Sequence, residues 1–203
     1  VFSNGGPGTE VTAKIRGGSA NQTLVLIDGA IVNSGTVGSY NFANLTTDNI
    51  ERVEILRGSQ SMLWGSDAMG GVINIVTKRG QGPLSATGFM EYGSFASLRE
   101  GGMVSGKQGA VDYSFSLSRW DTSSFSAVNY RRGAGERDSY RNWQGSGRIG
   151  VDLPKDGRLD FTMRWMNSDV QLDSVSATSP SDVYGSKNRS QEYVFSGSYE
   201  QPL

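Results

Sequence analysis

The second part of the chain, from about residue 82 onward, alternates apolar and polar residues with a period of two. In residues 159–165, Leu, Phe, Met and Trp occupy every second position and Asp, Thr and Arg lie between them, so all seven positions fit a β-strand. Residues 113–118, 143–153 and 193–199 alternate in the same way, and residues 84–92 and 98–107 do so more weakly. The pattern predicts six antiparallel strands of about ten residues, the length that a tilted strand needs to cross a bilayer.

The connections between these strands alternate in length. Residues 108–111 and 154–157 form tight turns, whereas residues 122–141 and 170–189 form long polar loops. Short turns on one rim and long loops on the other are typical of an outer-membrane β-barrel. Aromatic residues near strand ends fit interfacial girdles: Tyr92, Trp143, Trp165, Tyr193 and Tyr199. A soluble sandwich also alternates, but the polar face here carries small and charged groups where a sandwich has a second core.

Residues 1–80 follow a different, mixed pattern. The apolar run from Leu24 to Ile27 predicts a strand buried on both faces, and Asp28-Gly29 predicts a tight turn after it. Thr46 or Thr47 is expected to cap a short helix that reaches Glu51. Further along, residues 52–57 predict a strand, residues 59–64 a short helix ended by glycine, and residues 70–78 a buried strand. We therefore expect a small α+β unit ahead of the alternating strands.

The loop "GSDAMGG" contains the glycine spacing of a phosphate-binding loop, since Gly65 and Gly70 match its first two glycines. The Lys and Ser/Thr that should follow are replaced by Gly71 and Val72, and the order of helix, loop and strand is reversed. Nucleotide binding is therefore disfavoured. These glycines are better explained as positions where backbone segments pack closely, whereas Gly29 belongs to the Asp-Gly turn and Gly58 ends the strand of residues 52–57.

Composition excludes several classes of function. The chain has 19 basic and 20 acidic residues, so a general electrostatic affinity for nucleic acid is not expected. It has no His and no Cys, which removes the commonest general base, the commonest metal ligand and all thiol chemistry. With no carboxylate pair in an evident pocket either, the sequence does not favour an enzyme, and we expect neither a cofactor nor a metal.

Three ordered segments carry a family resemblance. "IRGG", "TLVLIDGAIVN" and "IERVEILRGSQSMLWGSDAMGGVINIVTK" resemble the plug domain of TonB-dependent outer-membrane receptors, in the branch that contains the cobalamin, siderophore and haem receptors. The resemblance implies a plug folded inside a β-barrel of the bacterial outer membrane, of the kind that has about 22 strands. We expect residues 1–80 to be an N-terminally truncated plug and residues 81–203 to be about six first strands of a C-terminally truncated barrel.

The resemblance also implies a function and partners. These receptors take up a scarce ligand, such as a ferric siderophore, haem or cobalamin, and are energised by a TonB-type inner-membrane protein that acts on an N-terminal segment. That coupling segment is not recognisable in the sequence. Outer-membrane lipid is the expected surrounding of the strands. The alternative is a non-transporting outer-membrane binding protein or adhesin on the same fold.

Two sets of site residues follow from the resemblance. Ligand contacts are expected from a plug loop and a barrel loop, namely Tyr40, Phe42, Tyr130, Arg131, Arg132 and Tyr140. The plug is expected to meet the polar inner wall through a charged cluster, namely Glu51, Arg52, Glu54 and Arg57, facing Arg148, Asp160 or Arg164. The acidic residues of the barrel loops are too sparse and too mixed with Arg for a calcium site.

Overall fold

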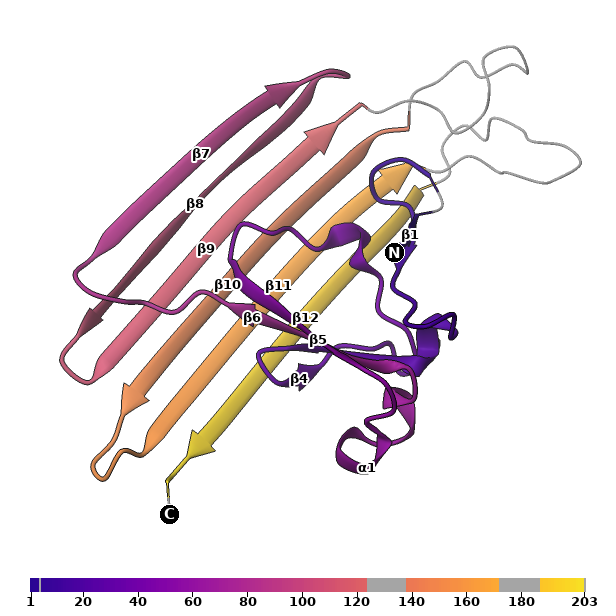
Figure 1. Ribbon diagram of the computed structural model, residues 1–203. Coiled ribbons are helices and arrows are strands. Elements are labelled where there is room, and N and C mark those ends of the chain that lie inside the picture. Colours follow the sequence, from indigo (N-terminus) through magenta and orange to yellow (C-terminus); the bar gives the residue numbers. More distant parts are fainter. Residues whose placement is uncertain (4, 124–137, 172–186, 203) are drawn as a thin grey trace, which may run out of the picture.

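The computed structural model of the chain describes residues 1–3, 5–123, 138–171 and 187–202. Most of these residues belong to a large six-stranded sheet and a smaller four-stranded sheet. Figure 1 shows the smaller sheet and its short helices lying against one face of the large one. We call residues 1–80 the plug and the large sheet the wall.

The wall is an antiparallel meander in which each strand pairs with its neighbours in the sequence. Its strands are β7 (Ser85–Gly93), β8 (Ser97–Gln108), β9 (Val111–Thr122), β10 (Tyr140–Asp152), β11 (Arg158–Gln171) and β12 (Lys187–Glu200). The six predicted strands are thus confirmed, as are the tight turns after β8 and β10. The later strands run longer than predicted because cross-strand pairing continues beyond the apolar positions into the polar strand ends.

The two faces of the wall differ as the alternation predicts. On one face, large apolar side chains such as Leu117, Phe161 and Phe195 are exposed. On the other, polar side chains such as Ser114 and Arg164 are buried although their strands carry no second apolar layer. The plug covers this polar face, which we call the inner face (Figure 1). A polar wall interior under the plug is therefore confirmed.

The plug sheet has the order β4-β3-β6-β5, and only β3 and β6 run parallel. The strands are β3 (Thr23–Ile27), β4 (Ala30–Ile31), β5 (Ile50–Arg57) and β6 (Gly71–Thr77). Strand β3 is buried along its whole length, which confirms the predicted buried strand. The turn after it has positive φ at Asp28 (47°) and Gly29 (82°), the left-handed conformation that an Asp-Gly pair favours. A short pair, β1 (Phe2–Ser3) with β2 (Val11–Thr12), precedes this sheet.

The plug's helices are short. They are α1 (Ser61–Trp64) and three 3-10 turns, η1 (Ala20–Gln22), η2 (Phe42–Asn44) and η3 (Ser66–Ala68). Helix α1 ends at Gly65 as predicted. The helix predicted from Thr46 or Thr47 is wrong: the Ile50 amide bonds the Thr47 carbonyl in a turn, and pairing with β6 draws Glu51 into a strand. No helix in the described part of the chain is long and apolar enough to cross a membrane.

Apolar side chains fill both sides of the plug sheet. One cluster contains Val25, Ile27, Tyr40, Ile73 and Ile75, and the other contains Leu24, Leu26, Ala68 and Val72. Both clusters use alternate residues of β3 and β6, because successive strand residues point to opposite faces. The plug thus has its own core, separate from its contact with the wall.

The chain passes from plug to wall at a very close backbone contact. Gly80 lies between β6 and β7 and is buried. A Cβ atom at this position would overlap the backbone carbonyl oxygens of Gly106 in β8 and Tyr113 in β9. Only glycine allows this approach, because neither carbonyl can move without disturbing the strand ladder.

We expect Gly80→Ala to destabilise the intact receptor by about 1–3 kcal/mol, since the added methyl group overpacks a site bounded by backbone. The measurement is the urea midpoint of unfolding in detergent. Gly35→Ala is the matched control, because its Cβ would meet nothing within 4 Å. Equal midpoints for the two variants would contradict the close contact.

Candidate functional site

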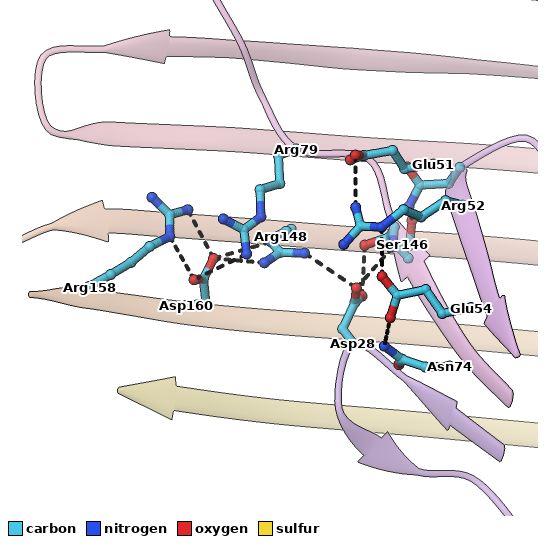
Figure 2. Close-up of polar contacts among 12 residues, drawn as sticks. Asp28, Glu51, Arg52, Glu54, Asn74, Arg79, Ser146, Arg148, Arg158 and Asp160 are labelled. Carbon is cyan, nitrogen blue, oxygen red and sulfur yellow. Dashed lines mark hydrogen bonds and ion pairs between the residues drawn. The ribbon is translucent and has the colours of Figure 1, made fainter. Parts of the chain in front are cut away.

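The candidate site is the contact between the plug and the inner face of the wall. Its central residue is Asp28, in the turn between β3 and β4. Oδ1 of Asp28 accepts from the Thr77 backbone amide at 2.9 Å, and Oδ2 accepts from the Thr77 hydroxyl at 2.7 Å. The same Oδ1 also accepts from Nη1 of Arg148 on β10 at 3.3 Å (Figure 2). One carboxylate therefore fixes the end of β6 and joins the plug to the wall.

Arg148 belongs to an ion-pair network within the wall. Its Nε and Nη2 atoms donate to Oδ1 of Asp160 on β11 at 3.2 and 3.1 Å, and both side chains are only 7% exposed. Arg158 donates to Asp160 at 2.7 Å and to Asp112 on β9 at 2.8 Å. Arg79, which follows β6, lies 3.9 Å from Asp160 (Figure 2). Buried charges of this kind need partners, and the network supplies them.

A second ionic contact lies at the first hairpin of the wall. Arg99 on β8 pairs with Asp48 of the plug, and it also lies 3.6 Å from Glu91 on β7. The Lys78 ammonium donates to the Asp48 backbone carbonyl at 2.8 Å, which fixes the segment that carries this carboxylate. The two ionic contacts hold the plug at separate places on the wall.

Neutral hydrogen bonds fill the space between the ionic contacts. Asn49 donates from Nδ2 to the Ser146 hydroxyl at 2.5 Å. The Thr46 hydroxyl donates to Oε1 of Gln144 at 3.1 Å, and this oxygen also accepts from Nη2 of Arg164 at 2.5 Å. All of these wall residues lie on the inner face of β10 or β11. The segment 46–49, where we predicted a helix cap, instead lays its side chains against the wall.

Tyr140, at the start of β10, also contacts the plug. Its hydroxyl donates to Oδ1 of Asn44 at 2.9 Å, and Asn142 donates to the Asn44 carbonyl at 3.1 Å. The Tyr140 ring packs edge-on against the Trp120 ring, with centroids 5.1 Å apart. The prediction that Tyr140 lies in a loop is wrong: it is the first residue of β10 and is 1% exposed, because strand pairing extends to it.

The charged cluster predicted to meet the wall instead pairs within β5 and with its neighbour β6. Arg52 donates to Glu54 at 2.8 Å and to Glu51 at 3.0 Å, and Asn74 donates to Glu54 at 2.9 Å (Figure 2). The hydrogen bonds from Asn74 and Arg52 lower the pKa of the Glu54 carboxyl. In the described ranges, no hydrogen bond or ion pair joins Glu51, Arg52, Glu54 or Arg57 to the wall.

The correction concerns the plug partner. Arg148 and Asp160 do contact the plug, but the plug partner of Arg148 is Asp28 and that of Asp160 is Arg79. Strand β5 is an edge of the plug sheet, and its charged side chains remain exposed and pair with one another. The sequence did not single out Asp28 as a contact with the wall, because the Asp-Gly turn alone accounts for an aspartate at this position. The signal that would have found it is a charge at a turn that follows a fully buried strand.

The two predicted plug aromatics belong to the plug core. Tyr40 is 6% exposed and meets Phe42 edge-on, with ring centroids 5.0 Å apart. Burial raises the pKa of the Tyr40 phenol far above its ordinary value, so it stays protonated. Their packing holds the loop that carries Asn44, and ligand contact by either ring stays a prediction. Tyr130, Arg131 and Arg132 lie outside the described residues.

The motif glycines serve the plug backbone. Gly71 opens β6 with φ of 152°, and a Cβ there would overlap the Leu56 carbonyl of β5. The Gly70 amide donates to the Gln22 carbonyl at 2.8 Å, next to the start of β3. Gly58 and Gly65, both with positive φ, end β5 and α1. Gly70 and Gly71 thus match the expectation of close backbone packing, whereas Gly65 does not. A Cβ at Gly58 or Gly65 would meet no backbone within 4 Å, and only the positive φ of these two residues favours glycine.

Comparison with known proteins agrees with this architecture. The family model for the TonB-dependent receptor plug domain matches residues 1–72. The chain is 39% identical over 106 residues to the vitamin B12 transporter BtuB of Photobacterium profundum, covering 52% of the chain and 18% of that protein. Its identity to BtuB of Vibrio cholerae is 34% over 113 residues, or 56% of the chain and 16% of that protein. The chain thus spans less than a fifth of these relatives.

Among solved structures, the siderophore receptor PirA from Pseudomonas aeruginosa superposes with a TM-score of 0.63 and 26% identity. That likeness covers 91% of the chain and 30% of PirA, so it includes wall strands as well as the plug. The plug match, the BtuB relatives and the receptor fold all lead to one assignment. Residues 1–72 are a TonB-dependent receptor plug domain, and the plug and wall together have the fold of the TonB-dependent receptors of the bacterial outer membrane.

Proposed function

We propose that the receptor containing this chain takes up a scarce ligand across the outer membrane, with the plug as a movable gate. The observation that carries the proposal is the chemistry of the plug–wall contact. The plug has its own apolar core, whereas it meets the wall through hydrogen bonds and ion pairs such as Asp28–Arg148 and Tyr140–Asn44. When the plug shifts, water can form hydrogen bonds with the polar groups that lose their partners. Water could not compensate in this way for the loss of an apolar contact.

The ligand classes follow from the relatives. The curated relatives above are named vitamin B12 transporters, and a structural neighbour is named a siderophore receptor. We therefore propose cobalamin or a ferric siderophore first, with haem as a further candidate. Energy would come from a TonB-type protein of the inner membrane, because a gate that is held by many contacts needs work to open it.

Binding identifies the ligand. We expect the intact receptor in detergent to show saturable tryptophan quenching by one member of a panel of cobalamin, haem and ferric siderophores, with a Kd below about 1 µM, as a scarce ligand requires. Iron-free siderophores are the control. A flat response across the whole panel would oppose these ligand classes and favour a non-transporting binding protein.

Energised uptake separates a transporter from an adhesin on the same fold. We expect cells to accumulate the labelled ligand, and we expect a protonophore to abolish accumulation while leaving surface binding unchanged. The reason is that binding is an equilibrium property, whereas opening of the gate consumes energy. Binding without any protonophore-sensitive accumulation would contradict the proposal.

The Tyr140 contact gives a test of the gate itself. Tyr140→Phe leaves Oδ1 of Asn44 buried without its donor, a loss of about 1–3 kcal/mol. We expect a lower urea midpoint for plug unfolding, which is followed by a fluorophore on a cysteine introduced at an exposed plug position. Tyr193→Phe is the matched control, since Tyr193 is exposed on the outer face. Equal midpoints would show that the hydroxyl does not hold the plug.

A further inference from the structure

Each wall charge that pairs with the plug also has a partner within the wall. Arg148 shares its guanidinium between Asp28 of the plug and Asp160 of β11. Arg99 shares its guanidinium between Asp48 of the plug and Glu91 of β7. These two wall arginines therefore have an ionic partner besides the plug.

The third ionic contact repeats this arrangement with the signs reversed. The wall carboxylate Asp160 lies 3.9 Å from Arg79 of the plug, but within the wall it accepts from Arg158 at 2.7 Å and from Arg148 at 3.1 Å. On the plug side, Asp28 keeps two hydrogen bonds from Thr77 whether or not Arg148 is present. Neither surface depends on the other for the pairing of its central buried charge.

This sharing has a physical consequence. Removing the single partner of a buried charge is costly because the remaining charge is left uncompensated. A charge that already has a second partner loses less when the first departs, and its attraction to the first is reduced by the second. The plug is therefore attached by ion pairs that are individually weakened by the wall.

We propose that Asp160 and Glu91 act as counter-ions for plug release: they hold Arg148 and Arg99 while the plug is away and weaken their attachment to it while it is docked. The inference rests on the proposed function only in requiring that the plug can move. Its test uses neither ligand nor energy source, so it can fail while uptake is established, and uptake can fail while it holds.

The reporter is a thiol on the wall beneath the plug. Ser114 is 2% exposed and stands opposite Arg148 in the β9–β10 register, and this sequence contains no Cys. In the intact receptor in detergent, with Ser114→Cys as the single thiol, maleimide labelling reports how often the plug is displaced. Each rate is divided by the rate of the same variant with its plug unfolded in urea, which corrects for changes in thiol reactivity.

We expect Asp160→Asn and Glu91→Gln to slow labelling at least about twofold, because each frees an arginine to bind the plug more strongly. Asp28→Asn should accelerate labelling. Glu91 is 64% exposed, so its substitution does not threaten the fold. Asp169→Asn is the matched control, as its carboxylate pairs with Arg189 at the exposed end of β11.

A double-mutant cycle gives the decisive comparison. If Asp160 weakens the attachment, Asp28→Asn accelerates labelling more strongly in the Asp160→Asn background than in the wild type. An equal or smaller acceleration in that background would overturn the proposal. Faster labelling for both Asp160→Asn and Glu91→Gln would overturn it as well, because those carboxylates would then be helping to hold the plug.

Discussion

The inner face of the wall buries charged and amide groups that need hydrogen-bond partners, and the rest of the structure depends on how partners are supplied. Arg148, Asp160 and Gln144 are buried by the plug, and each finds partners in the wall, the plug or both. Apolar material on the plug surface would leave these groups unsatisfied at a cost of about 1–3 kcal/mol each. The plug therefore has to present polar groups where it meets these side chains.

This division explains the odd sequence of the chain. A short stretch with continuous apolar runs builds a self-contained sheet, and a long alternating stretch builds a wall with two unlike faces. The outer face needs nothing from the plug, since its apolar side chains suit lipid. The inner face and the plug surface carry complementary polar groups.

Strands and turns of this chain were predictable because alternation, apolar runs and Asp-Gly are local signals. The partners across the plug–wall contact were not. Asp28 and Glu54 are both acidic residues of the plug sheet region, and only the position of β5 at the sheet edge shows that Glu54 pairs with Arg52 while Asp28 reaches Arg148. Tyr140 was assigned to a loop because its pairing with β9 and β11 has no signature in its own segment.

The close backbone contact at Gly80 bears on the direction in which the plug can travel. Because the chain is pinned between the carbonyls of two wall strands there, this point acts as a pivot. A body tethered at one point turns about it, so the parts of the plug farthest from Gly80 sweep the longest arc. A passage beside the plug would then open as a wedge, widest away from the pivot.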